Sequence, residues 1–598
     1  MKKILLVLLV IGMLTRCNNS IPKSDKANEQ LSVLLQHFYD DKMQLFPLEA
    51  TVNGDKRFNN LLPADFTDSY RLKLTSFFTK NKEAIKKIDR ESLNANDKIS
   101  YDIFNYEMEM ALNGLSMHYM TNSASANSYM PFDQFNGIPL MLGQMGGGTG
   151  NQPFKTVADY DNWIQRATAF TAWSDSAIVY FKKGMANNYT LPSALVKKII
   201  PQMNAMVTDS ATNSLFYGPI KLFPAGFSAA DKARLTTAYQ TLITVQLVPA
   251  YKKLALFLQN EYLPKARNTT GVNALPGGDA YYKFMVNYWT TTQKTPDEIY
   301  TTGLAEVKRI RTIMDSIKTT VHFTGNLNAF FNFMNTDKQF MPYKTADEVL
   351  NAFRGIQATI TPNLKKMFSR TPKTTFEIRQ TEAFRAASAS AEYYQGLPDG
   401  SRSGIFYVPI LDATKFNTTS GMESLFLHEA IPGHHYQMSL QMENAQLPKF
   451  RQFIWYGAYG EGYALYSESL GKELGLYTDP YQYMGALGDE VHRAIRLVVD
   501  VAMHTGKMTR EEAIKYMTEN EAISDEGATA EIERYMSYPA QALGYKTGAL
   551  KIRVLREKYR QQLGDKFSLA AFHDEFLKDG CMPLAIIETK MDEWAKTK

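Results

Sequence analysis

The sequence has few cysteines and no strong excess of one charge. Only Cys17 and Cys581 occur in 598 residues, so a disulfide framework is excluded, and a chain of this length can rely on a large core instead. With 66 basic and 61 acidic residues, the formal net charge is only +5. No dense Lys/Arg block is present, so nucleic acid is not an expected partner.

The most apolar run of the chain lies at its start. MKKILLVLLVIGMLTRC has two lysines, an apolar run from Ile4 to Leu14, and then Cys17. The run is too short to span a bilayer as a mature helix and has the layout of a signal peptide. A cysteine directly after it resembles a bacterial lipoprotein signal, in which the cysteine is acylated, although Arg16 stands where a small residue is usual. We expect an exported protein anchored by lipid at Cys17 to the bacterial cell envelope, on the periplasmic or outer-membrane side; secretion with cleavage elsewhere is the alternative.

The rest of the chain has an ordinary globular composition, with 44% hydrophobic and 21% charged residues. We predict a tether at 18–28, a helical region at 29–380 and a catalytic region at 381–598, in one continuous fold. TPDEIY is typical of a helix start, with Thr295 as the cap, Pro296 in the first position and Glu298 closing a capping box. GIFYVPIL, bounded by Gly404 and Pro409, predicts a strand, which we expect at a sheet edge.

Residues 428–435 read HEAIPGHH, which places three of the nine histidines beside a glutamate. A zinc hydrolase needs imidazole or carboxylate ligands, an open position for water and a carboxylate base. His428 and Glu429 have the order found in HExxH helices, but Pro432 occupies the position of the second histidine. On a regular helix His434 would face away from His428, and His435 would lie two turns, ~10 Å, further along.

Pro432 itself predicts an irregular helix. A proline lacks the backbone N–H and clashes with the carbonyl four residues earlier, here that of His428, which costs ~3 kcal/mol in a regular helix. Gly433 permits unusual dihedral angles. We therefore expect a bulge or break at Pro432 and Gly433 that brings one of the two later histidines back toward His428.

The segment HEAIPGHHYQ closely resembles the HEAxPGHHxQ signature of a widespread bacterial family of unknown function. Its members are often lipoproteins and are thought to belong with the gluzincin metallopeptidases. Further similar segments are EGYALYSESLGKELG, RAIRLVVDVAMHTGKMTREEA, RYMSYPAQALGYKTG, FRAASASAEYY and SRSGIFYVP. The resemblance implies one zinc ion per chain in a large, mainly α-helical zincin-type fold, with a small β-sheet near the metal helix and a channel between helical halves.

Gluzincins take a third zinc ligand from a glutamate on a downstream helix. Glu461 and Glu468 share one helical face, and we assign Glu461 as the ligand, with Glu468 as the alternative that otherwise orients a histidine. By analogy with peptidases that have the stretched motif HExxGH, such as dipeptidyl peptidase III, His434 is the expected second ligand. His435 stays open as the alternative.

Three residues are candidates for the chemical step. Glu429 is the expected general base toward zinc-activated water. In angiotensin-converting enzyme and its relatives, a downstream histidine and tyrosine stabilise the oxyanion, and His504 and Tyr545 are the corresponding candidates. Asp500 lies one turn before His504 and is expected to fix its tautomer.

Substrate contacts are expected from the predicted strand, through Tyr407, and from Arg534 as a carboxylate clamp, with Arg493 and Arg496 as further candidates. The resulting hypothesis is an exported zinc metallopeptidase that hydrolyses short peptides. The alternatives are a non-catalytic metal-binding or scaffold lipoprotein and a zinc hydrolase of another amide. Glu429 argues against the scaffold, since a binding protein needs no base beside a metal.

Overall fold

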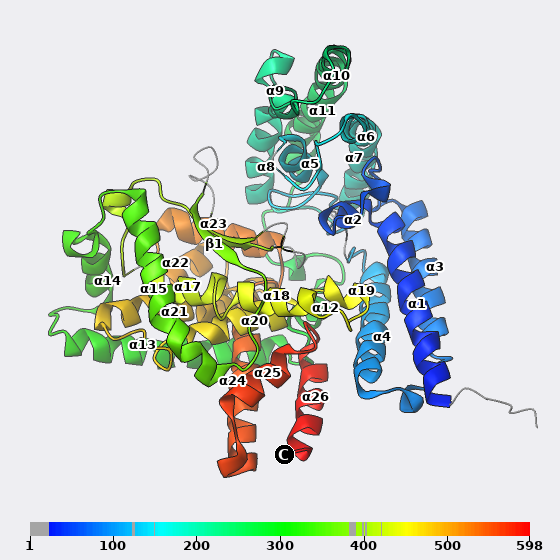
Figure 1. The fold of residues 1–598 in the computed structure, drawn as a ribbon. Helices are drawn as coiled ribbons and strands as arrows, with labels where there is room; N and C mark the ends of the chain where they lie inside the picture. Colours follow the sequence, from blue (N-terminus) through cyan, green and yellow to red (C-terminus); the bar gives the residue numbers. More distant parts are fainter. Residues whose placement is uncertain are drawn as a thin grey trace, which may run out of the picture.

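The computed structural model describes residues 23–121, 123, 126–148, 150–381, 390–396, 400, 403–419 and 421–598. Cys17 and the predicted signal peptide lie outside this range. The chain is mainly helical with one small three-stranded sheet (Figure 1), which confirms the predicted fold class.

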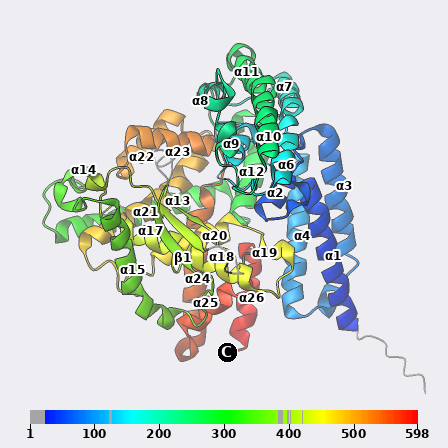
Figure 2. The same ribbon diagram turned by 45° about the horizontal axis from the view of Figure 1, so that its top comes forward.

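The first helices form a layer along one side of the molecule. They are α1 (Lys23–Leu45), α2 (Pro47–Val52), α3 (Asp68–Ile85) and α4 (Ala95–Ser116), and α1, α3 and α4 lie side by side in Figures 1 and 2. The predicted tether at 18–28 is wrong over its second half, because α1 begins at Lys23. Ala27 is buried in the core, and the side chain of Asn28 accepts a hydrogen bond from the Asn94 backbone N–H. These contacts hold the first turns of α1 against the start of α4.

A second group of helices has its own aromatic core. It comprises α5 (Ile138–Gly146), α6 (Val157–Thr168), α7 (Phe170–Ala186), α8 (Ser193–Ala205), α9 (Gly218–Lys221), α10 (Ala229–Thr241) and α11 (Val248–Phe257). Trp163, Trp173, Tyr239 and Tyr251 are buried within it. The helical stretch Ala229–Lys265 is long and apolar enough to cross a membrane, but half of its most apolar window is buried inside the protein, as expected of a core helix.

The next four helices precede the sheet in the chain. They are α12 (Gly278–Thr290), α13 (Pro296–Thr320), α14 (Leu327–Thr336) and α15 (Ala346–Met367). The predicted start of α13 is confirmed, because Thr295 and Glu298 form a reciprocal capping box. Helix α13 packs along α21 (Pro480–His504), where a side chain at Gly303 would lie 2.8 Å from Leu497.

The sheet has the order β1-β3-β2, with β1 (Phe376–Gln380) parallel and β2 (Glu392–Tyr394) antiparallel to β3 (Gly404–Val408). The predicted strand is therefore correct, but its predicted edge position is wrong. Both sides of β3 are paired, because the strand lies between its two neighbours. Its residues Phe406 and Val408 are buried in the core. Its backbone is not free to pair with an extended substrate.

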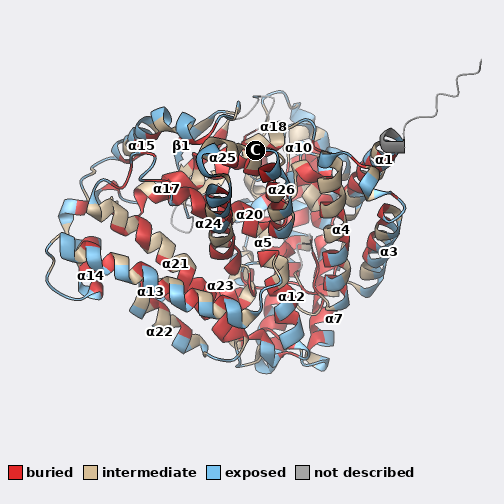
Figure 3. Cartoon of the chain, turned by 90° about the horizontal axis from the view of Figure 1, so that it is seen from below, coloured by how far each residue is buried: buried red, intermediate tan, exposed pale blue. Residues whose placement is uncertain are grey.

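The remaining helices carry the sequence motifs. They are α17 (Met422–Glu429), α18 (His434–Glu443), α19 (Lys449–Gln452), α20 (Gly457–Glu468), α22 (Arg510–Asn520), α23 (Asp525–Ser537), α24 (Leu543–Leu563), α25 (Leu569–Leu577) and α26 (Leu584–Lys596). Helix α20 and the first half of α24 lie near the centre and are largely buried, whereas α3 and α14 expose one face (Figure 3). One hydrophobic core joins residues of α1, α3, α4 and α15 to the sheet and to α17, α18, α20 and α24–α26, so it includes residues from both sides of the predicted boundary at 380.

Candidate metal centre

The HEAIPGHH segment is a broken helix. Helix α17 ends at Glu429, the peptide bond between Ile431 and Pro432 is cis, and α18 begins at His434. A Cβ atom at Gly433 would lie 2.0 Å from the His428 carbonyl oxygen. Only glycine therefore allows the start of α18 to approach the end of α17 this closely. The break is at the position that the sequence predicts.

This break brings His428 and His434 together with Glu461 of α20. Ligand atoms of the three side chains all lie within 4.8 Å of one another. The Nε2 atoms of His428 and His434 are 3.6 and 3.4 Å from Glu461 Oε2. Two ligand atoms about 2.0–2.1 Å from a tetrahedral zinc ion lie about 3.3–3.4 Å apart. The spacing and the two-nitrogen, one-carboxylate donor set therefore fit zinc without a large rearrangement.

Glu468 holds His428 from the opposite side of the ring. His428 Nδ1 donates a hydrogen bond of 2.7 Å to Glu468 Oε1, so Nε2 faces Glu461. Burial lowers the pKa of His428, but hydrogen bonds to Glu461 and Glu468 outweigh burial and raise that pKa to about 10. Burial raises the pKa of Glu461, but the positive charges of His434 and His428 hold it well below its ordinary value. A divalent cation would take the place of the proton shared by these groups.

His434 is oriented by two residues that the sequence analysis missed. The amide nitrogen of Gln437 lies 3.0 Å from His434 Nδ1 and donates to the Gly460 carbonyl oxygen at 2.9 Å. The Trp455 ring lies beside His434, with 5.9 Å between ring centroids, and 41% of Trp455 is exposed. The HEAxPGHHxQ pattern ends at Gln437, so the sequence contained a signal for this residue. No comparable sequence signal marks Trp455.

His435, the alternative ligand, lies outside the cluster. Its Nδ1 forms a 2.8 Å hydrogen bond with the Tyr393 hydroxyl, and its ring lies against Phe376 of β1. Burial lowers the pKa of His435 to about 4. His435 thus joins α18 to the sheet as a neutral side chain.

Glu429 and Tyr545 lie next to the cluster, and no described residue forms a hydrogen bond with the polar group of either side chain. Glu429 is half-buried, directly follows His428, and forms no hydrogen bond or ion pair with any described residue. Tyr545 is placed by the crossing of α20 and α24, where a Cβ atom at Gly462 would lie 2.6 Å from Gly548 Cα. Burial raises the pKa of Tyr545, and the negative charge of Glu461 adds to this effect. This crossing places Tyr545 near Glu461, which directly precedes Gly462 on α20.

His504 does not fit its predicted catalytic role. It is fully buried; its Nδ1 accepts a hydrogen bond from the Val272 N–H, and its Nε2 donates to the Tyr535 carbonyl. Neither nitrogen is left to contact an oxyanion. The expected pairing with Asp500 is also wrong, because Asp500 accepts hydrogen bonds from Tyr282 and from the Ala540 backbone. His504 is a core histidine that links three segments.

Tyr407 also lies away from the cluster. Side chains alternate across a strand, and Phe406 of β3 packs against Phe426 of α17. Tyr407 therefore occupies the opposite face of the sheet, where it contacts Tyr394.

Arg534 is at the end of α23, half-buried, and donates a 2.8 Å hydrogen bond to Gln541.

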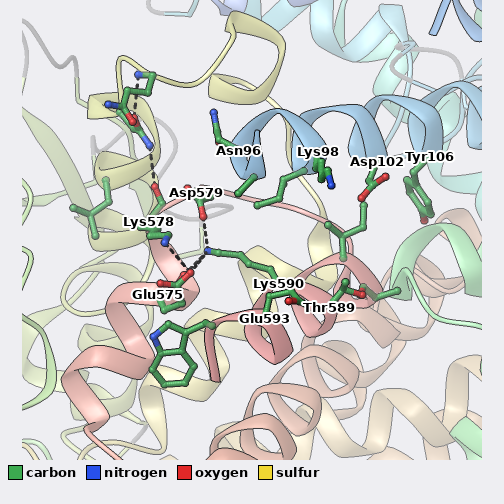
Figure 4. Close-up of a pocket in the computed structure, with 18 of the residues that line it drawn as sticks. Asn96, Lys98, Asp102, Tyr106, Glu575, Lys578, Asp579, Thr589, Lys590 and Glu593 are labelled. Atoms are coloured by element: carbon green, nitrogen blue, oxygen red, sulfur yellow. Dashed lines mark hydrogen bonds and ion pairs between the residues drawn. The ribbon is translucent and has the colours of Figure 1, made fainter. Parts of the chain in front are cut away.

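A large groove lies elsewhere in the molecule (Figure 4). Its volume is about 1300 Å³ and it is lined by α4, α25, α26 and the end of α18. Several of its charged groups are paired with each other, among them Lys590 with Asp579 at 2.8 Å and Lys578 with Glu575 at 2.8 Å. None of the three cluster residues lines this groove, so the channel expected at the metal centre stays a prediction.

The sequence profile of a family described as "Bacterial protein of unknown function (DUF885)" matches residues 47–591. The chain belongs to the DUF885 family. Among solved structures, it is similar to a "putative lipoprotein from Colwellia psychrerythraea", with 28% identity, a TM-score of 0.87, and coverage of 96% of this chain and 100% of that one. It is also similar to a "putative lipoprotein of unknown function from Shewanella oneidensis", with 19% identity, a TM-score of 0.70, and coverage of 94% and 99%. A comparison with curated proteins finds no match.

Proposed function

We propose that this DUF885 protein is a zinc-dependent metallopeptidase that binds one zinc ion through His428, His434 and Glu461. One observation carries the proposal: the Nε2 atoms of both histidines converge on Glu461 Oε2. The Nδ1 atoms face outward, toward Glu468 and Gln437. This arrangement leaves the inward nitrogens as metal ligands, with their rings fixed by neighbouring side chains.

A bound zinc ion would act as a Lewis acid toward the peptide carbonyl and toward water. Glu429 would accept a proton from the attacking water and transfer it to the leaving nitrogen; such a base typically contributes about 10²- to 10⁴-fold in rate. Its half-buried carboxylate, which forms no ion pair with any described residue, suits that role. The Tyr545 hydroxyl would donate a hydrogen bond to the negative charge that develops on the carbonyl oxygen, and the raised pKa of Tyr545 keeps its proton in place.

The proposal includes export and a lipid anchor at Cys17. The N-terminal apolar run ending at this cysteine supports it, as does the similarity to two proteins described as putative lipoproteins. The substrates would be short peptides in the cell envelope.

The decisive experiment compares the wild-type protein with Glu429→Gln. Metal analysis should find one zinc ion per chain in both proteins, because Glu429 is not among the converging ligands. Hydrolysis of a peptide library should fall by about 10²- to 10⁴-fold in the variant. A protein that purifies without metal and cannot be loaded with it would refute the site. Unchanged hydrolysis by a zinc-loaded Glu429→Gln protein would refute the mechanism.

A further inference from the structure

Three arginines belong to one charged network with Tyr545. Arg493 and Arg496 are one turn apart on α21, and Arg534 is near the end of α23. The Arg496 guanidinium lies over the Tyr545 ring, 4.8 Å from its centroid. Arg496 pairs with Glu531 at 3.1 Å, and the same carboxylate is 3.5 Å from Arg534. Arg534 is therefore connected to Tyr545 through these contacts. Burial raises the pKa of Tyr545, and the positive charges of the three arginines oppose that rise.

Two of these arginines are committed to the fold. Arg496 has a side chain only 7% exposed, donates to the Tyr535 hydroxyl at 2.9 Å and pairs with Glu531 at 3.1 Å. Arg493 pairs with Asp489, four residues earlier on the same helix, at 3.1 Å. Arg496 thus joins α21 to α23, and Arg493 takes part in an ion pair within α21.

Arg534 differs from them. Its side chain is 25% exposed, and its one short hydrogen bond goes to the neutral amide of Gln541. Among the described residues, its only carboxylate contact is with Glu531, at 3.5 Å, and that carboxylate already pairs with Arg496 and accepts from Tyr535. A guanidinium has five N–H donors in a planar fork that matches a carboxylate. Arg534 thus keeps donors for a second anionic partner.

From this geometry we infer that Arg534 binds a substrate carboxylate, so that the proposed peptidase acts near a free peptide C-terminus. The inference rests on the proposed function. The contacts that lead from Tyr545 through Arg496 and Glu531 to Arg534 are 4.8, 3.1 and 3.5 Å long. An extended residue spans about 3.3–3.6 Å, so a carboxylate bound by Arg534 would lie within a few residues of a scissile carbonyl that contacts Tyr545. The carboxylate source would be the C-terminus rather than an acidic side chain.

The test uses matched peptides that end in a free acid or an amide. The wild-type protein should cleave the acid with a kcat/KM on the order of 10- to 100-fold higher, as expected for a charge-assisted hydrogen bond. Arg534→Gln should reduce this ratio to near one through a loss that falls mainly on the acid. Arg510→Gln is the matched control: its side chain is 21% exposed, it lies on the neighbouring α22 and it pairs with Glu533 and Glu511. This control should keep the full ratio.

Two outcomes overturn the inference: equal cleavage of acid and amide by the wild-type protein, or an equal loss for both peptides in Arg534→Gln. A third arm uses an amidated peptide with aspartate at its last position. Cleavage of that peptide as fast as the free acid would assign the site to a side-chain carboxylate and refute the C-terminal preference.

A binding measurement separates this inference from the proposed function. Calorimetry with the zinc-loaded Glu429→Gln protein should show tighter binding of the acid than of the amide, and Arg534→Gln in the same background should remove the difference. If no peptide is hydrolysed by the wild-type protein but this binding difference is found, the peptidase proposal fails and the carboxylate site stands. Equal binding of both peptides rejects the site.

Discussion

Glu468→Gln tests whether the outer contacts of the cluster create its metal affinity. Glu468 is buried, and its carboxylate accepts the 2.7 Å hydrogen bond from His428 Nδ1. Glutamine has the same shape and retains an acceptor oxygen, but it carries no charge. The substitution therefore removes the electrostatic part of the contact while the His428 ring stays in place.

The size of the effect follows from this one hydrogen bond. Bonds to charged groups contribute roughly 1.5–3 kcal/mol and neutral ones roughly 0.5–1.5 kcal/mol. The difference of about 1–2 kcal/mol corresponds to zinc binding about 5- to 30-fold weaker, which overlaps the range of about 10- to 100-fold that is typical when outer partners of metal ligands are changed. Glu468→Ala should weaken binding further, because it leaves Nδ1 buried without a partner.

The assay is competition for zinc between the protein and a chromophoric chelator at neutral pH. Glu473→Gln is the control, because Glu473 follows in the same segment, is 43% exposed and pairs with Arg556. The control should bind zinc as the wild type does. The reasoning is wrong if Glu468→Gln binds zinc as tightly as the wild type, or if both variants weaken binding equally.

Three further predictions concern the backbone and pH. Gly433→Ala should destabilise the protein by about 1–3 kcal/mol or more and reduce bound zinc well below one ion per chain. The reason is that the new Cβ atom would lie 2.0 and 2.3 Å from the His428 and Leu427 carbonyl oxygens. The control is Gly355→Ala, where no atom lies within 4 Å of the new Cβ, and it should keep both the melting temperature and the zinc content. Gly548→Ala places a Cβ atom 1.8 Å from the Ala458 carbonyl oxygen, three residues before Glu461 on α20. It should lower the melting temperature, hydrolysis and zinc affinity together; unchanged zinc affinity in a destabilised variant would contradict this. Burial lowers the pKa of His504 from 6.5 to about 4, so the folded state binds fewer protons than the unfolded state between these values, and stability falls as pH drops through this range, by up to roughly 3 kcal/mol. Melting curves from pH 7 to 4 should be flatter for His504→Gln, whereas exposed His37→Gln should leave them unchanged.

The sequence was sufficient for the features that depend on local chemistry. The proline in a helix that otherwise matches HExxH predicts a break, and the structure has one between Glu429 and His434. The helix start at Thr295 follows from the capping box alone. The convergence of His428, His434 and Glu461 was predicted from a family resemblance, since the spacing of the residues could not select between His434 and His435.

The features that failed depend on tertiary partners. Asp500 and His504 are one helical turn apart, but each forms its hydrogen bonds with a distant segment instead. Tyr282 donates to Asp500, and the Val272 N–H donates to His504. The strand with Tyr407 was expected at an edge because the pairing of β1 and β2 on its two sides has no local signal. Helix α1 begins early because Ala27 packs in a core that includes the C-terminal helices. In each case the deciding contact is with residues far away in the chain.

The break between α17 and α18 also changes what determines the geometry of the histidine pair. In a continuous helix, two ligands one turn apart have a separation fixed by the backbone hydrogen bonds between them. Here each histidine belongs to a different helix, and each helix takes its orientation from its own neighbours in one shared core. The zinc affinity of such a site would therefore depend on the packing of that core, and substitutions remote from the ligands would be detectable as changes in metal affinity.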